Sequence, residues 1–175
     1  MPSEKTRLEA NSFNLQFLIL SIFSLKFSNS LALFFEAAVA GAIPIINVLE
    51  NRMLSDDIFN IYGILNGTCN YILSQMNEKK ISFDTALKNA QNAGFAEADP
   101  SFDVDGIDAA HKTIILSALV YGKMPNVDNL TIKGIRDITL NDISYCNHLG
   151  YKIKLLGNSL ISKNKNGEDE LCCSV

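Results

Sequence analysis

Apolar residues recur at spacings of three and four along five stretches of the chain, and this spacing predicts helices. Most of the stretches carry a residue typical of a helix end: proline in the first turn, serine or threonine as N-cap, or glycine just beyond the last turn. The predicted helices cover residues 44–53, 68–76, 82–93, 106–121 and 139–149. Residues 13–30 are also apolar but lack a clean polar face, so they fit a buried helix.

Short apolar runs rich in aromatic and β-branched residues predict strands between these helices. They lie at residues 31–35, 58–65, 130–135 and 151–161, and a further strand starts at 170–175. Asn66 and Gly67 would suit a hairpin turn, but Thr68 and a helical pattern follow directly, so we interpret this junction as strand, turn and capped helix. Such a junction can bind a phosphate, carboxylate or amide, although a plain capped turn explains the same residues.

Composition places the chain among globular proteins. Its 175 residues allow one domain with a real core, or a domain and a fragment of another; 47% are hydrophobic and 19% charged. The net charge of −4 and the absence of a basic stripe argue against a nucleic-acid partner. Four cysteines without metal-type spacing and two histidines make a zinc site unlikely and favour a reduced, cytoplasmic protein with free thiols.

The apolar run at residues 13–27 has some features of a secretory signal, because Lys5 and Arg7 precede it. Glu4 and Glu9 weaken that interpretation, and the run is shorter than the roughly 20 residues that span a bilayer. A buried helix or a poorly formed start is therefore favoured, and no membrane partner is expected.

An acidic stretch stands out from the apolar chain around it. Five acids fall within the twelve residues from Glu97 to Asp108, and either Asp103 or Asp105 would suit the N-cap of the helix that follows. Asp108 and Lys112 are four residues apart and share one helix face. The stretch could hold a small zwitterion beside a proton donor, or it could be a solvated loop with an ordinary ion pair. Spacing alone favours the second interpretation.

The sequence from Ala90 to Lys112 closely resembles the signature of homoserine dehydrogenases. In this chain it is A-x3-G-F-A-x2-D-P-x2-D-V-x-G-x-D-x3-K. FEAAVAGAIPII at 35–46, GILNGTCNYIL at 63–73, SFDTALKNAQNAG at 82–94 and the stretch from Ile138 to Gly157 follow in the family's order, so the likeness covers about residues 31–160. The resemblance implies an α+β catalytic domain with a mixed sheet covered by helices, usually dimeric, beside a Rossmann nucleotide domain. It implies reduction of L-aspartate 4-semialdehyde to L-homoserine with NADP or NAD, in threonine and methionine biosynthesis.

The resemblance also implies roles for individual residues. Lys112 is similar to the family's proton donor, while Glu97 and Asp108 are similar to its substrate-binding acids. Asp103 matches a further polar residue of the site, and Gly94 matches a glycine that approaches the dinucleotide. The family's monovalent cation site, which suits sodium, maps onto the residues Glu36, Val39, Gly41 and Ile43. Each of these residues also has a purely structural interpretation, and for His111 packing or a surface position is favoured.

The chain departs from the family's pattern at both ends. It has no glycine-rich phosphate loop, and residues 1–30 match nothing that precedes the 31–35 strand in the family, including its Ala-Asn-Lys motif. We therefore expect a domain over residues 31–175 that is incomplete at its C-terminus, preceded by an unmatched segment. Two hypotheses stay open: a dehydrogenase fragment that is inactive without a Rossmann domain, or a non-catalytic remnant that dimerises or binds a small ligand.

Overall fold

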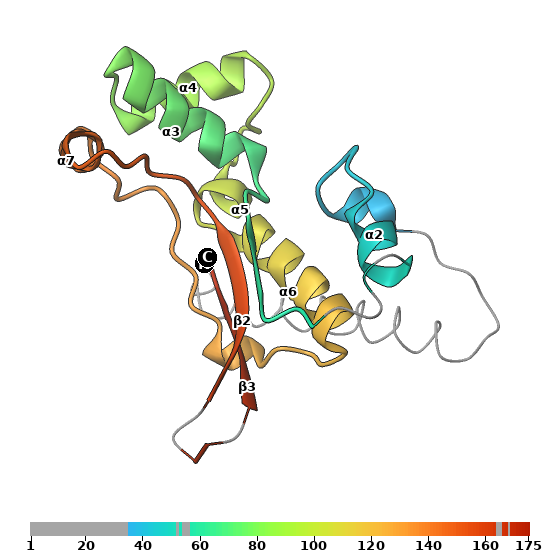
Figure 1. Cartoon of the computed structure of the whole chain (residues 1–175). Helices are drawn as coiled ribbons and strands as arrows, with labels where there is room; N and C mark the ends of the chain where they lie inside the picture. Colours follow the sequence, from blue (N-terminus) through green and yellow to red (C-terminus); the bar gives the residue numbers. More distant parts are fainter. Residues whose placement is uncertain (1–34, 52, 54–56, 164–165, 168) are drawn as a thin grey trace. The chain divides into compact units, whose positions relative to one another are not determined.

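The computed structural model describes residues 35–51, 53, 57–163, 166–167 and 169–175 (Figure 1). The chain divides into two compact units, residues 1–54 and 55–175, and each is described by itself. The predicted helix at 13–30 and residues 31–34 of the first predicted strand lie outside the described residues.

The described part of the first unit is a turn and a short helix. The 3-10 helix η1 covers Glu36–Ala38, and α2 covers Ile45–Asn51 directly after Pro44, within the predicted range of 44–53. Between them, Ala40 and Ala42 adopt left-handed backbone conformations with φ of 52° and 67°. Such angles are uncommon for residues that carry a Cβ atom, and each stores of the order of 1 kcal/mol of strain.

The second unit has its helices where the apolar spacing predicts them. The long helices are α3 (Gly67–Lys79), α4 (Phe83–Asn92), α6 (Ile107–Tyr121) and α7 (Leu140–His148). As predicted, Ser82 caps α4, where its hydroxyl accepts from Thr85 N, and Thr139 caps α7 through a capping box with Asp142. Two short elements, α5 (Ser101–Val104) and the 3-10 helix η2 (Val127–Asn129), complete the described helices of this unit.

The strands of this unit form one three-stranded antiparallel sheet in the order β1-β2-β3. They are β1 (Asn60–Gly63), β2 (Gly157–Lys163) and β3 (Asp169–Ser174), so the predicted strands at 58–65 and 170–175 are confirmed. The predicted strand at 151–161 begins only at Gly157. The one parallel pairing among described residues is an isolated bridge between Thr131 and Ser174. Helix α6 packs against β2 and β3 (Figure 1).

The hydrophobic core is centred on α3. Ile72 and Met76 are fully buried there, against Ala86 and Ala90 of α4, Val104 of α5 and Ile143 of α7. Burying a side chain of this size contributes about 1.5–3 kcal/mol to the stability of the fold. The contacts of α3 therefore hold α4, α5 and α7 in place. The α+β class predicted from the sequence is confirmed, because helices and an antiparallel sheet share this unit.

Two predictions for the segments next to α5 are wrong. Residues 130–135 form no strand beyond the bridge at Thr131; they run as a connecting segment in which Ile135 N donates to Val104 O at 2.8 Å. At Gly134 an added Cβ would lie 2.3 Å from Val104 O, so the segment lies directly against the end of α5. Neither Asp103 nor Asp105 caps α6: Asp103 belongs to α5, and Gly106 is the N-cap of α6 without a side-chain hydrogen bond.

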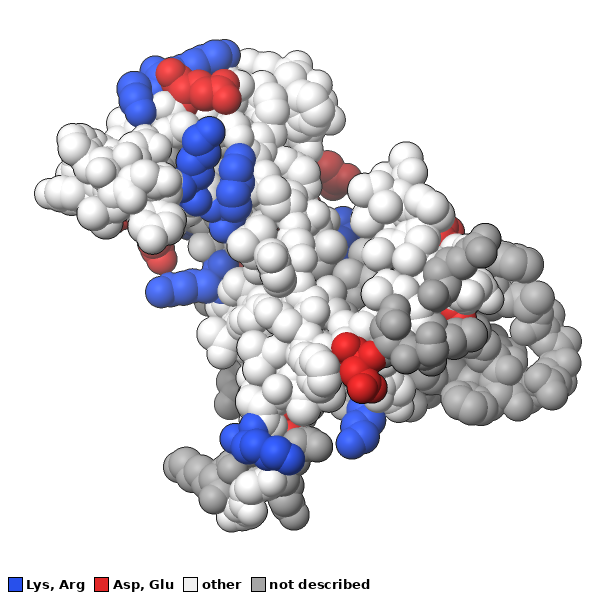
Figure 2. All heavy atoms as spheres, in the orientation of Figure 1, with Lys and Arg blue, Asp and Glu red and all other residues white. Residues whose placement is uncertain are grey.

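Basic and acidic side chains lie side by side over α3 and α4 on the face drawn in Figure 2. Near them, a hollow between α3, α7 and the chain before β2 is lined by Glu78, Lys152 and Lys154 among others, and Lys154 Nζ donates to Ser74 Oγ at 2.9 Å. None of the candidate site residues predicted from the sequence lines this hollow. In the part of the chain described, no helix combines the length and the apolar character needed to cross a membrane.

Candidate active site at the start of helix α3

Asn66 stands where the chain leaves β1 and enters α3. Its Oδ1 accepts a hydrogen bond from Cys69 N at 2.8 Å, which makes Asn66 the N-cap of α3. Thr68, the N-cap predicted from the sequence, instead donates its hydroxyl to Phe95 O at 2.8 Å, so that prediction is wrong. Asparagine outranks threonine as an N-cap, and it lies one residue before the helix begins.

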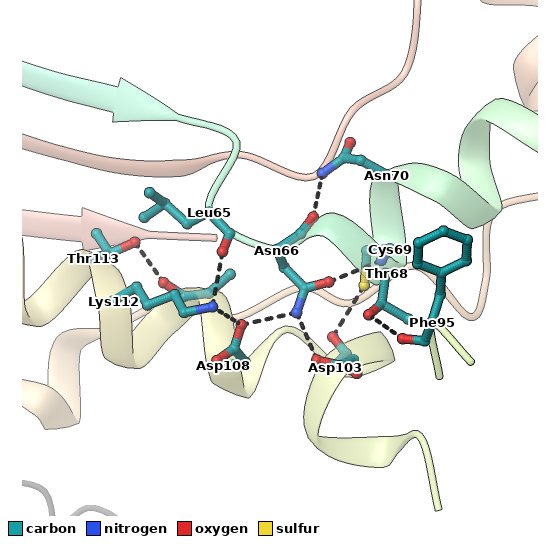
Figure 3. A network of polar contacts seen from close by, with 11 residues as sticks. Leu65, Asn66, Thr68, Cys69, Asn70, Phe95, Asp103, Asp108, Lys112 and Thr113 are labelled. Atoms are coloured by element: carbon teal, nitrogen blue, oxygen red, sulfur yellow. Dashed lines mark hydrogen bonds and ion pairs between the residues drawn. The ribbon is translucent and has the colours of Figure 1, made fainter. Parts of the chain in front are cut away.

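The cap fixes the orientation of the Asn66 amide. A backbone N–H can only donate, so the atom facing Cys69 N must be the side-chain oxygen, and Nδ2 points away from the helix. Figure 3 shows that Nδ2 faces two carboxylates. It donates to Asp103 Oδ1 of α5 at 2.6 Å and to Asp108 Oδ2 of α6 at 2.8 Å.

Lys112 completes this group, one turn after Asp108 on α6. Its Nζ donates to Asp108 Oδ2 at 2.7 Å and to Leu65 O at 3.1 Å. The Lys112 and Asp108 side chains are only 25% and 19% exposed, so the pair is sheltered and not the solvated ion pair that spacing alone favoured. We call Asn66, Asp103, Asp108 and Lys112 the acidic cluster. Two carboxylates and one ammonium give it a formal charge of −1.

Cys69 lies beneath the cluster as a buried thiol. Its Sγ donates to Asp103 O at 3.1 Å. Burial, followed by the negative charges of Asp103, Asp108 and Asp105, raises the pKa of Cys69 from 9.0 to about 12. A thiol with this pKa stays protonated and is a poor nucleophile, so Cys69 is a packing residue of α3.

Glu97 and Gly94 lie on the loop between α4 and α5. This loop is fastened to the first turn of α3 by the Thr68 hydrogen bond and by the rings of Tyr71 and Phe95, whose centroids are 4.6 Å apart. The Glu97 side chain is exposed and contacts no member of the acidic cluster by hydrogen bond or ion pair among the described residues. Gly94 has a φ of 76°, and space for a Cβ there is open. The loop thus presents Glu97 and Gly94 to solvent near the α3 start.

Glu36 has a structural role in the first unit. Its Oε1 accepts from Ile46 N at 2.8 Å and its Oε2 accepts from Asn47 N at 3.0 Å, so the carboxylate satisfies the first turn of α2. Ile43 O accepts from Ile45 N at 2.7 Å. No donor contacts the carbonyl oxygens of Val39 or Gly41 among the described residues. One carboxylate and three loop carbonyls, of which that of Val39 belongs to a fully buried residue, make an all-oxygen donor set of the kind that a hard cation prefers.

His111 is a neighbour of the cluster and not a member of it. Its ring packs edge-on to Phe102, with centroids 5.3 Å apart. Burial lowers the pKa of His111, and the charge of Asp108 acts in the opposite direction. The lowered pKa keeps the imidazole neutral at pH 7, which favours packing over a surface position, the two alternatives that the sequence left open.

The acidic cluster can hold a cation and deliver a proton. Its formal charge of −1 can attract the ammonium group of a ligand. An ammonium has three N–H groups, and the described residues accept from Lys112 Nζ twice, which leaves one N–H for a ligand oxygen. A ligand with an ammonium at one end and a carbonyl oxygen at the other matches both features.

The sequence predicts Asp103, Asp108 and Lys112 as site residues, and the structure brings these three together. It did not find Asn66 as a member of the site, because the contacts of Asn66 span 37 and 42 residues along the chain. The available signal was an asparagine at a strand-to-helix junction already marked as a possible ligand site. The same spacing rules cannot say which distant side chain an asparagine faces.

Comparison with known proteins points to one family throughout. A family model described as homoserine dehydrogenase matches residues 44–175. The chain is 48% identical over 136 residues to a homoserine dehydrogenase of Neisseria gonorrhoeae, covering 78% of this chain and 31% of that protein. It is 46% identical over 129 residues to that of Bacillus subtilis, covering 74% and 30%. The chain thus spans about a third of the length of these relatives.

Solved structures agree with the sequence comparison. A homoserine dehydrogenase from Thiobacillus denitrificans superimposes with a TM-score of 0.72 at 47% identity, covering 79% of this chain and 32% of that one. A hyperthermophilic archaeal homoserine dehydrogenase in complex with NADPH superimposes with a TM-score of 0.70 at 30% identity, covering 89% and 42%.

Proposed function

Because this chain belongs to the homoserine dehydrogenase family, we propose that it supplies the substrate side of an NAD(P)-dependent reduction of L-aspartate 4-semialdehyde to L-homoserine. This reaction belongs to threonine and methionine biosynthesis, in the cytoplasm. The observation that carries the proposal is the sheltered contact of 2.7 Å between Asp108 and Lys112, held beside Asp103 by one amide.

In this proposal Asp108 binds the α-ammonium of the substrate, and Glu97 approaches it from the exposed α4–α5 loop. Asp103 contributes negative charge on the other side of Asn66. Binding the substrate at its charged end places the aldehyde oxygen near Lys112, whose third N–H donates to it. A nicotinamide cofactor, when bound, supplies the hydride for the aldehyde carbon. Lys112 gives its proton to the oxygen, so no alkoxide accumulates.

The dinucleotide would approach this chain at Gly94, where the loop is exposed and no atom lies within 4 Å of the point that a Cβ would occupy. Glu36, with the carbonyls of Val39, Gly41 and Ile43, would hold sodium. The support is the all-oxygen donor set and the strained backbone at Ala40 and Ala42, which a bound cation would help to hold. Protection of this loop from proteolysis by sodium but not by tetramethylammonium would test the cation site, and equal cleavage would contradict it.

A homodimer is the proposed assembly. Ser159 of β2 faces α6, because its hydroxyl contacts Cys173, which in turn contacts Ser117 of α6. Ile61 of β1 pairs with Ser159 and therefore lies on the same face of the sheet. Side chains alternate along a strand, so the next residue, Tyr62, lies on the opposite face. Tyr62 is 71% exposed there. A large exposed aromatic on a sheet face suits an interface. Sedimentation of the protein and of a Tyr62→Lys variant tests this; a wild-type monomer would contradict it.

Homoserine-dependent formation of NADH or NADPH tests the reaction directly. The chain is assayed alone and mixed with a separately produced Rossmann nucleotide-binding domain of a relative, and we expect activity to need the mixture. Lys112→Ala should lower kcat by about 10²–10⁴-fold. Lys112→Arg is the matched control, because arginine keeps the positive charge beside Asp108 but does not release its proton.

If Lys112→Arg retains a rate near that of the wild type, Lys112 is not the proton donor. If no reduced cofactor forms from folded protein in either arrangement, the chain is not the substrate half of this enzyme. Binding of homoserine without turnover would then favour a non-catalytic small-ligand module.

A further inference from the structure

The side chain of Asn66 is hydrogen-bonded at both ends, and both of its donor protons are used. It is only 3% exposed. Its oxygen accepts from Cys69 N, and the two protons of Nδ2 go to Asp103 and Asp108. Its backbone oxygen accepts from Asn70 Nδ2 at 3.0 Å, and Asn70 is bonded in turn to Leu155 N and O. The amide is therefore held from the core side and directed at the two acids.

Capping alone does not explain this choice of residue. Serine, aspartate and asparagine are about equally good N-caps. Of the three, asparagine alone can accept from the helix and donate two hydrogen bonds to carboxylates at the same time. It also brings the two carboxylates together without cancelling their charge, whereas a lysine would neutralise the cluster and an aspartate would repel both acids.

We propose that Asn66 is a positioning residue of the active site: its amide bridges Asp103 and Asp108 and holds the net negative charge that receives the substrate's ammonium. The bridge also sets the angle of the Asp108 carboxylate, whose Oδ2 accepts from both Asn66 and Lys112. Asn66 itself touches neither the substrate nor the reacting atoms. This inference rests on the proposed function, because it assigns the ligand of the cluster from that reaction.

Several titratable groups surround Asn66, and each bears on a pH test. They come from every element packed around it: Cys69 on α3, Asp103 on α5, Asp105 at the α5–α6 junction, and Asp108, His111 and Lys112 on α6. Variants are therefore compared with one another at each pH, so that contributions common to all of them cancel.

Two substitutions separate the cap from the bridge. Asn66→Ser and Asn66→Asp both keep an oxygen for Cys69 N, and both lose the amide protons. Asn66→Ser adds no charge, so it reports the loss of the bridge alone. Asn66→Asp adds a carboxyl that faces two others, and protonating that carboxyl at lower pH lets it donate again and removes the repulsion.

The first readout is binding of L-homoserine to the full chain by isothermal titration calorimetry at pH 7.5 and pH 5. We expect Asn66→Ser to weaken binding about tenfold at both pH values, as for loss of a hydrogen bond to a charged group. Asn66→Asp should weaken binding more at pH 7.5 and approach Asn66→Ser at pH 5. Affinities of both variants within about twofold of the wild type would overturn the inference.

The second readout needs no ligand. The melting temperature of Asn66→Asp should lie about 3 °C or more below that of Asn66→Ser at pH 7.5, and the difference should shrink toward pH 5. The sign follows because repulsion raises the pKa of the introduced carboxyl in the folded state, so stability is lost as pH rises through it. Equal melting temperatures at both pH values would show that the amide does not bridge the acids.

The two readouts distinguish the possible failures. If the wild type binds no homoserine but the melting temperatures separate with pH, the proposed function fails, and with it the ligand assigned here. If the wild type binds homoserine and Asn66→Ser binds equally well, the proposed function stands and the positioning role of Asn66 is wrong.

Discussion

We propose that a few side chains near the start of α3 carry the chemistry of this chain. Asn66 bridges Asp103 and Asp108, and Lys112 donates to Asp108 from the other side. Three of these four residues could be found from the sequence, because the family's signature is a run of local spacings. Asn66 could not, because its role depends on contacts between segments far apart in the chain.

The buried thiol of Cys69 should be inert while exposed Cys172 reacts. Because the pKa of Cys69 is raised to about 12 in the folded state, iodoacetamide at pH 8 should label Cys172 and leave Cys69 unmodified. Mass spectrometry of tryptic peptides measures this. Rapid labelling of Cys69 in folded protein would contradict the burial of this thiol.

The same thiol gives a dependence of stability on pH. A folded pKa of about 12 against 9.0 in the unfolded chain means that the stabilisation is complete below pH 9 and is lost as pH rises toward 12. Urea unfolding at pH 8 and pH 10.5 should therefore show a larger loss of stability for the wild type than for Cys69→Ala.

At the scale of elements, the α5–α6 junction places both acids. Residues 133–135 contact this junction, because Ile135 N donates to Val104 O at 2.8 Å and Lys133 O lies 3.6 Å from the point that a Cβ on Gly106 would occupy. Arg136 pairs with Asp105 and donates to Ser101 Oγ at 3.1 Å, which fastens the same junction from outside. Asp103 reaches Asn66 because α5 is held in this way.

Gly134→Ala should loosen this junction. The new Cβ would lie 2.3 Å from Val104 O and 2.6 Å from Asp105 Cα, which are backbone atoms that cannot rotate away. We expect a loss of about 1–3 kcal/mol in the free energy of unfolding. Gly63→Ala is the matched control, because no atom lies within 4 Å of a Cβ there. Equal stability of the two variants in urea would rule out the close contact.

The elements differ in how far their sequence determines them. Apolar periodicity and caps predicted α3, α4, α6 and α7, because these signals are local. Helix α5 has four residues, too few to show a period. Residues 130–135 have the composition of a strand, but tertiary contacts with α5 and Val175 determine their conformation.

At the scale of the whole molecule, the chain presents an acidic, partly sheltered site on a core centred on α3. It spans about a third of the length of its curated relatives. The family signature predicted the α+β class and the three charged residues of the cluster. The exposure of Glu97 and the capping role of the Glu36 carboxylate follow from the fold and could not be predicted from spacing.

In the proposed function, the acidic cluster binds the ammonium end of homoserine while Lys112 faces its oxygen. The most direct measurement is a ¹H–¹⁵N NMR titration of the full chain with L-homoserine, with N-acetyl-L-homoserine as the matched ligand that lacks the ammonium. We predict saturable shifts of the Asn66 side-chain amide and of the backbone around Asp108 with L-homoserine, and at least about tenfold weaker binding of the acetylated ligand. Equal binding of both ligands, or shifts confined to residues away from α3, α5 and α6, would contradict the account.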